Sequence, residues 1–169
     1  MFAGRPEVGA VGAKLYYPDD TIQHAGLVLG VFGLAGHSYR HFPRAHPGYM
    51  GRLNQAQNVS GVTAACLMMS KRVYKEVNGF NEQFQIAFND VDLCMRIRKA
   101  GYLIVFNPFA ELYHYESKTR GYDDTQDKKT RFDNEVSLFK SLWKDELKQG
   151  DPYYNPNLTL VNVDFSTVN

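Results

Sequence analysis

Apolar residues occur along the chain in short runs that are separated by turn-forming residues. The first run covers residues 8–17 and ends at Pro18, and a second run covers residues 22–32. Runs of this length that are rich in Val, Ile and Tyr and flank a Pro-Asp turn are typical of neighbouring strands. Further strands are predicted at residues 59–69, 102–107 and 111–115, the last two on either side of Pro108.

Other stretches carry apolar residues at helical spacing. Ser70 is a suitable N-cap and Gly79 a suitable end for a short helix. Residues 89–101 have acidic side chains at the start and basic side chains at the end, which complements a helix dipole. An apolar stripe through residues 127–148 predicts a long helix.

Two segments lack any periodicity. Residues 33–58 collect His, Pro, Gly and Arg and are long for a connector, so we expect a functional or mobile loop. Residues 150–169 are rich in Pro and Asn and are expected to lie on the surface or to be disordered. We therefore predict one α/β domain over residues 1–149, followed by an extended C-terminal tail over residues 150–169.

Composition is typical of a soluble globular protein. The 19 basic and 18 acidic residues give a net charge of +1, which provides no general attraction to nucleic acid. The chain has no apolar run long enough to span a membrane and no signal-peptide pattern, so a cytoplasmic protein is expected. Cys66 and Cys94 lie in apolar runs without metal-ligand spacing and are predicted to be buried free thiols.

Asp90 and Asp92 are two carboxylates in the first turn of a predicted helix. Acidic residues are favoured there for structural reasons alone, because they complement the dipole. A carboxylate that faces a cleft could instead act as a general base toward a substrate hydroxyl. Asp90 is nearer the preceding loop and is the better candidate for that role.

His114 and the basic residues that follow it form a second candidate region. A lone histidine is more often structural, but imidazole can join oxygen ligands around a divalent ion such as Mg²⁺ or Mn²⁺. Lys118 and Arg120 either contact a diphosphate or belong to a solvated basic loop. The serine-hydrolase elbow, the P-loop and the zincin helix motif are all absent.

Five motifs follow one another in a recognisable order, and together they resemble the second half of a family 2 glycosyltransferase of the rhamnosyltransferase-like group. They are VGAVGAKLYYPD at residues 8–19, IQHAG at 22–26, GFNEQF at 79–84, NDVDLCMRIRKAGY at 89–102 and LYHYES at 112–117. The resemblance covers residues 8–121. It implies a GT-A-like mixed sheet flanked by helices, without the N-terminal nucleotide-binding half.

The resemblance also implies an activity. Such enzymes are inverting hexosyltransferases that move a sugar from a nucleotide-sugar donor to an acceptor hydroxyl, commonly in the synthesis of cell-surface polysaccharide or other glycans. The signature of processive synthases is absent, which favours a single transfer. By resemblance, Asp90 is the catalytic base and His114 contacts the metal, and the positions expected at the acceptor are Asp92, Asn89, Phe80, Asn81 and Glu82. Asn89 and Asn81 stand where the family often has an acidic residue, and Asp92 could orient either the acceptor or the helix start.

The resemblance does not extend to the nucleotide-binding half of such enzymes. A complete enzyme of this kind carries an upstream Asp-x-Asp pair that holds Mg²⁺ or Mn²⁺, and only seven residues precede Val8. We therefore expect an acceptor-side half that turns over little by itself. The rival hypothesis is a non-catalytic glycan-binding or protein-assembly module. An apolar face left open by the absent half would favour homo-oligomers, and peripheral attachment to a membrane is compatible with either hypothesis.

Overall fold

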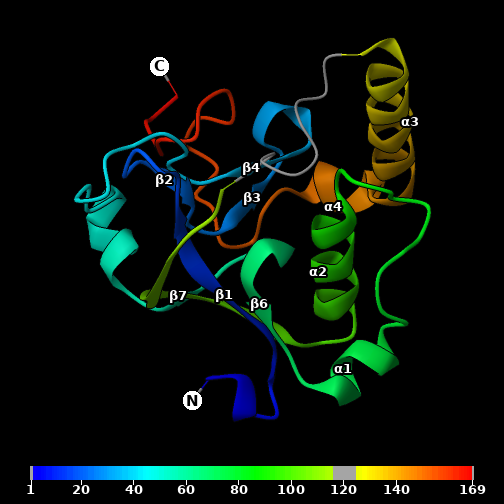
Figure 1. Cartoon of the computed structure of the whole chain (residues 1–169), viewed down its shortest axis with the longest axis horizontal. Coiled ribbons are helices and arrows are strands. Elements are labelled where there is room, and N and C mark those ends of the chain that lie inside the picture. The colour runs from blue at the N-terminus through cyan, green and yellow to red at the C-terminus, as the bar shows by residue number, and fades with distance from the viewer. Residues whose placement is uncertain (1, 116–124, 169) are drawn as a thin grey trace.

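The computed structural model describes residues 2–115 and 125–168 and shows a mixed sheet with helices packed against it (Figure 1). The main sheet has the strand order β2-β1-β7-β5, and β6 also pairs with β1. A second, two-stranded sheet contains β3 and β4. The strands are β1 (Val8–Tyr16), β2 (Ile22–His24), β3 (Leu27–Leu29), β4 (Ala35–His37), β5 (Gln57–Asn58), β6 (Leu67–Met68) and β7 (Leu103–Tyr113). The α/β class and the mixed sheet flanked by helices agree with the sequence analysis.

β1 is the central strand of the main sheet. It runs parallel to β7 along its whole length, from the pair Val8 and Leu103 to the pair Tyr16 and Tyr113. Its other edge pairs antiparallel with β6 and, near its C-terminal end, with β2. The predicted pairing of the first two apolar runs is thus confirmed. The second run is divided into β2 and β3 at Gly26, whose φ of 91° breaks the extended conformation.

The helices are α1 (Lys71–Glu76), α2 (Asn89–Lys99), α3 (Gln126–Leu142) and α4 (Lys144–Gln149). α1 begins as predicted, because the Ser70 hydroxyl accepts a hydrogen bond from the Val73 amide at 3.2 Å. The predicted long helix is interrupted at Trp143, which has the non-helical angles φ −115° and ψ 25°. Short 3₁₀ turns occur at Phe2–Gly4, Val31–Gly33, Tyr49–Asn54 and Ala64–Cys66.

α2 lies between the sheet and the other long helix. One stripe, with Leu93 and Ile97, belongs to the same apolar core as the residues of β1 and β7. The opposite stripe, with Val91 and Met95, packs with Phe139 and Trp143 of the α3 and α4 region. A Cβ atom at Gly9 would lie only 2.4 Å from the Ile97 side chain, so glycine permits the close approach of α2 to β1.

Two strand predictions need correction. Residues 59–69 form only the two-residue strand β6 after an irregular path, along which Val59 and Val62 are buried. Residues 103–113 form one strand rather than two. Its pairing with β1 jumps from Asn107 to Glu111, so the intervening residues bulge out around Pro108, which has no amide hydrogen for the ladder. Cys94 is buried as predicted, whereas Cys66 is half-buried, and both are free thiols.

The C-terminal residues 150–169 were predicted to form an extended tail, and this prediction is wrong. Leu158 and Phe165 are buried in the main apolar core. The Phe165 ring stacks on Tyr39 with a centroid distance of 5.0 Å, and the Arg52 guanidinium lies 4.0 Å from the centroid of the Phe165 ring. The tail is therefore part of the folded unit.

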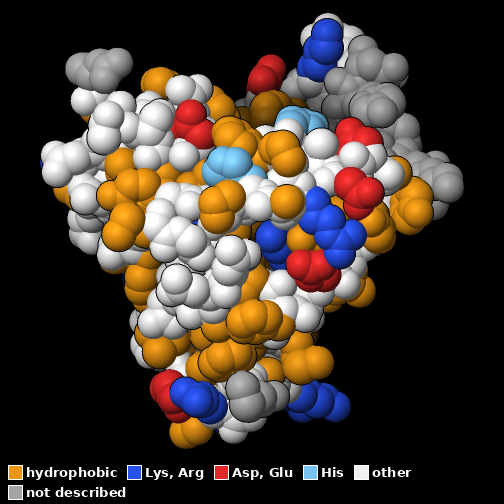
Figure 2. All heavy atoms as spheres, turned by 90° about the vertical axis from the view of Figure 1, so that its left-hand side faces the viewer, with side chains coloured by type: hydrophobic (Ala, Val, Ile, Leu, Met, Phe, Trp, Pro, Cys, Tyr) orange, Lys and Arg blue, Asp and Glu red, His pale blue; other side chains and the backbone are white. Residues whose placement is uncertain are grey.

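Charged side chains on the surface are mixed in sign. Acidic and basic groups lie next to one another on the face shown in Figure 2. Arg44 illustrates the pattern, since its guanidinium lies 3.4 Å from Asp20 and 2.5 Å from Glu111. Within residues 2–115 and 125–168, no helix is long and apolar enough to cross a membrane.

Candidate functional site

Asp90 lies in the first turn of α2, where the chain enters the helix from Phe88 in a left-handed conformation with φ 62°. The carboxylate is half-buried and is held against a neighbouring turn. Its Oδ2 atom accepts a hydrogen bond from the Ala64 amide at 3.2 Å, and its Oδ1 atom accepts one from the Val91 amide at 2.8 Å. The Asp90 carboxylate is thus held in place by two backbone amides.

The turn that contacts Asp90 also borders a small polar cavity. Thr63, the neighbour of Ala64, lines a cavity of about 160 Å³ together with His37, Arg40 and His114. Asp90 and His114 are thus each associated with the segment containing Thr63 and Ala64, Asp90 through a hydrogen bond and His114 through the shared cavity. The roles of Asp90 as base and of His114 as metal contact stay predictions.

Gln23 of β2 fixes the orientation of the His114 ring. The Gln23 Nε2 group donates to the His114 carbonyl oxygen at 3.3 Å, which turns Oε1 toward the imidazole. Oε1 lies 2.8 Å from His114 Nδ1 and, having no hydrogen, must accept a hydrogen bond from an Nδ1–H group. The neutral ring then keeps a lone pair on Nε2. Metal-binding histidines are commonly held in this way by an acceptor on their other nitrogen.

His24 lies behind the cavity and is fully buried. Its Nε2 atom accepts hydrogen bonds from the amides of Gly26 and Thr63, at 3.3 and 3.2 Å. The ring proton is therefore on Nδ1, 3.0 Å from Nδ1 of His37. Burial, assisted by the nearby His37, holds the pKa of His24 well below its ordinary value.

Acid is expected to destabilise the protein through His24. The folded-state pKa of His24 is depressed. The contribution of its neutral ring to the free energy of unfolding is therefore fully present above the ordinary pKa of 6.5, and it is lost as the pH falls from that value toward the folded pKa. The free energy of unfolding should fall by up to about 1.4 kcal/mol per pH unit in that window. Urea unfolding of the parent and of His24→Gln at several pH values measures this slope, which the variant should lack. The exposed His41→Gln should keep it, and a parent-like slope in His24→Gln would contradict the assignment.

Asp92 is buried between α2 and Trp143. Its side chain is 1% exposed and accepts hydrogen bonds from the Trp143 indole at 3.0 Å and from Arg96 Nε at 2.9 Å. The Arg96 guanidinium also forms an ion pair with it at 2.8 Å. These contacts link α2 to Trp143, and the predicted contact of Asp92 with an acceptor stays a prediction.

The remaining acceptor-side residues lie in the segment that leads to α2. Phe80 is 40% exposed and packs edge-on against Tyr74. Asn81 closes a local turn, because its side-chain oxygen accepts from the Gln83 amide at 3.1 Å. Glu82 is exposed, and Asn89 is the first residue of α2 and is half-buried. Their contact with an acceptor stays a prediction.

Two further expectations are not addressed by these contacts. Lys118 and Arg120 lie outside the described residues. Within the described ranges, no three His, Cys, Asp or Glu side chains are grouped so that they could hold a metal ion. His114 is therefore a single candidate ligand, and a Mg²⁺ or Mn²⁺ site would need oxygen ligands from elsewhere.

No known protein family profile matches the chain, but several curated proteins are similar to it. An uncharacterized protein of Sinorhizobium fredii is 52% identical over 164 residues, which is 96% of this chain and 18% of that protein. The O-antigen biosynthesis protein RfbC of Myxococcus xanthus is 37% identical over 164 residues, 96% of this chain and 12% of that protein.

A shorter stretch of the chain is similar in sequence to an enzyme. An N-acetylglucosaminyl-diphospho-decaprenol L-rhamnosyltransferase of Mycobacterium tuberculosis is 29% identical over 125 residues, 70% of this chain and 41% of the enzyme. The chain thus spans less than half the length of each of these relatives.

Proposed function

We propose that this chain is the acceptor-side half of an inverting, non-processive family 2 glycosyltransferase with a GT-A fold, acting in the synthesis of cell-surface polysaccharide. In this proposal the complete protein transfers a sugar from a nucleotide-sugar donor to an acceptor hydroxyl. Two of the relatives support it by name, one as an O-antigen biosynthesis protein and one as a rhamnosyltransferase. The mixed α/β architecture is compatible with it.

The observation that carries the proposal is the placement of the Asp90 carboxylate. It is half-buried at the start of α2 and bound to the amide of Ala64, whose neighbour Thr63 lines the same cavity as His114. In the proposed reaction Asp90 removes the proton of the acceptor hydroxyl. The acceptor oxygen forms a bond to the anomeric carbon while the bond from that carbon to the diphosphate oxygen breaks, and the nucleotide diphosphate leaves.

His114 is assigned to the leaving-group side. Gln23 holds the ring so that Nε2 presents its lone pair, as a metal ligand requires. A divalent ion at this place would offset the charge of the leaving diphosphate. Lys118 and Arg120, close to His114 in sequence, are proposed as further diphosphate contacts.

A hybrid protein tests this function. The matching segment of the Myxococcus relative is replaced by this chain, and O-antigen is measured in cells that lack the native relative. The parent hybrid should restore O-antigen. Asp90→Asn should lower transfer by a factor of about 10² to 10⁴, the usual contribution of a general base. Asp145→Asn is the matched control, because Asp145 is also in the first turn of a helix but is exposed on α4.

The possible results separate the hypotheses. A folded Asp90→Asn hybrid that transfers at the parent rate would show that Asp90 is not the base. If O-antigen survives this substitution but is lost when the whole segment is removed, the non-catalytic glycan-binding or assembly module is favoured. A folded parent hybrid that restores no O-antigen would count against the proposed function itself.

A further inference from the structure

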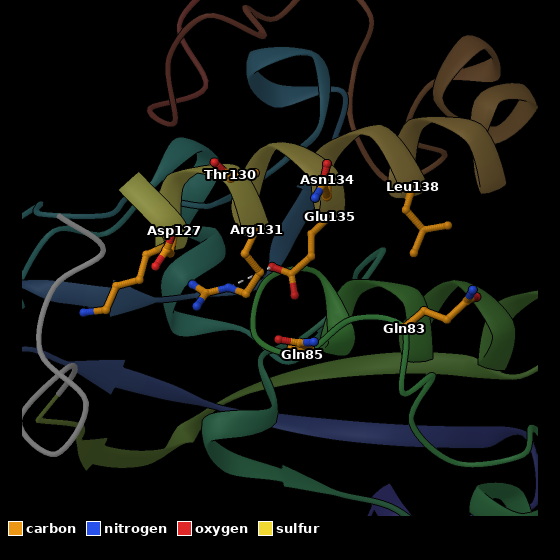
Figure 3. Close-up of a pocket in the computed structure, with 9 residues that line it drawn as sticks. Gln83, Gln85, Asp127, Thr130, Arg131, Asn134, Glu135 and Leu138 are labelled. Carbon is orange, nitrogen blue, oxygen red and sulfur yellow. Dashed lines mark ion pairs between the residues drawn. The ribbon is translucent and has the colours of Figure 1, made fainter. Parts of the chain in front are cut away.

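A broad groove lies between α3 and the segment 83–87 that runs beneath it (Figure 3). Its volume of about 690 Å³ falls within the range of about 300 to 1,000 Å³ that is usual for small-molecule sites. Gln83 and Gln85 come from the segment, and Thr130, Asn134 and Leu138 come from the helix. The sequence analysis assigned a role to none of these residues, although Gln83 lies within the motif at residues 79–84.

The two walls of the groove are joined by a buried carboxylate. The Glu135 side chain is 3% exposed and accepts hydrogen bonds from the amides of Ile86 and Ala87, at 2.9 and 3.1 Å. Arg131, one turn earlier on α3, lies 3.8 Å from the same carboxylate. These contacts attach the segment to α3, so the two walls of the groove are fixed before any ligand arrives.

The chemistry of the walls favours a neutral ligand with many hydroxyl groups. Gln83, Gln85 and Asn134 each carry an amide that both donates and accepts, which matches hydroxyl groups that do the same. The charges of the lining residues balance, because the negative charges of Asp127 and Glu135 equal in number the positive charges of Lys128 and Arg131. A balanced lining gives no strong attraction for a phosphate or a carboxylate, in contrast to a site dominated by basic groups.

The groove and the candidate base are close in sequence. Gln85 precedes Asp90 by five residues, so the two Cα atoms are at most about 18 Å apart even if the chain were fully extended. A sugar chain long enough to cover this distance could rest in the groove while its end reaches the start of α2. This connection gives the groove a role in the proposed reaction.

We propose that the groove between α3 and residues 83–87 is a carbohydrate subsite, in which Gln85 and Asn134 hydrogen-bond to the hydroxyl groups of the acceptor glycan. The proposal rests on the proposed function for the identity of the ligand as acceptor. The groove holds the part of the acceptor that does not react and thereby contributes to acceptor specificity.

Sugar binding by the 169-residue chain tests the subsite directly. The ¹⁵N-labelled chain is titrated with methyl α-L-rhamnoside and with methyl N-acetyl-β-D-glucosaminide and followed by two-dimensional NMR. At least one probe should shift the side-chain amides of Gln83, Gln85 and Asn134. Gln85→Ala and Asn134→Ala should each weaken binding by about 3- to 10-fold, the effect of losing one hydrogen bond. Both residues are exposed, so neither variant is expected to unfold.

Gln149→Ala is the matched control, since Gln149 is an exposed helical glutamine of α4 outside the groove. It should bind the probes like the parent. The proposal is overturned if no probe shifts the groove amides, if the shifts are insensitive to Gln85→Ala and Asn134→Ala, or if inorganic phosphate shifts these amides more strongly than either sugar.

The test also separates the subsite from the function on which it rests. Asp90→Asn should leave probe binding unchanged while it lowers transfer in the hybrid. Loss of transfer in Asp90→Asn together with absence of sugar binding would contradict the carbohydrate subsite but support the proposed glycosyltransferase function. Specific sugar binding together with parent-like transfer in Asp90→Asn would keep the groove as a glycan site and reject Asp90 as base.

Discussion

A chain that ends at Gln149 is expected to lose its cooperative fold. The truncation removes Leu158 and Phe165 from the apolar core and exposes Tyr39, on which Phe165 stacks. Loss of a buried Leu costs about 2 to 5 kcal/mol and loss of a buried Phe about 3 to 5 kcal/mol. The sum is comparable to the net stability of about 5 to 15 kcal/mol of a typical domain. Thermal unfolding followed by circular dichroism measures the effect.

Point variants in the tail provide the comparison. Phe165→Ala alone should lower the free energy of unfolding by about 3 to 5 kcal/mol. Val161→Ala should change it by less than about 0.5 kcal/mol, because Val161 is 73% exposed. A truncated chain that melts at the parent temperature would show that residues 150–169 are dispensable for folding.

Replacement of Asp92 by Ala is expected to lower the free energy of unfolding by about 3 to 5 kcal/mol. The substitution leaves the partly buried Arg96 without its carboxylate and the Trp143 indole without its acceptor. Removing one partner of a buried ion pair is costly because the remaining charge stays desolvated. Urea unfolding of the parent and the variant measures the difference.

Asp133→Ala is the control for charge removal, because Asp133 is exposed on α3. It should remain within about 0.5 kcal/mol of the parent. If Asp92→Ala were as stable as Asp133→Ala, the contacts of Asp92 with Arg96 and Trp143 would not support the fold.

Local sequence signals predicted the parts of the fold that depend on neighbouring residues. The turn at Pro18, the cap at Ser70 and the acidic first turn of α2 each correspond to a boundary in the structure. The break at Trp143 was missed because the apolar stripe continues through it. Trp143 leaves the helical conformation where its indole meets Asp92, a contact between residues 51 positions apart.

The tail was missed for a related reason. Its Pro and Asn residues form turns in the structure, as their chemistry dictates. The side chains of Leu158 and Phe165 are buried only because Tyr39 and the main core provide a surface for them. Composition alone does not distinguish such a tail from a disordered one.

The candidate site was predicted only in its chemically distinctive members. Asp90 and His114 stand out in sequence, whereas Gln23 was missed, although a polar residue inside the apolar run at residues 22–32 is a weak signal. Its contact with His114 spans 91 positions and exists because β2 and β7 both pair with β1. The groove along α3 was missed because it requires the contact between Glu135 and residues 86–87.

The position of β1 has a consequence for how the molecule opens. β7 covers one edge of β1 along its whole length, and β6 and β2 cover parts of the other edge. Backbone amides in such a strand exchange with solvent only when the whole domain unfolds. Gln23 and His114 are attached to the strands on either side of β1, so the imidazole keeps its orientation through the local fluctuations that open surface loops.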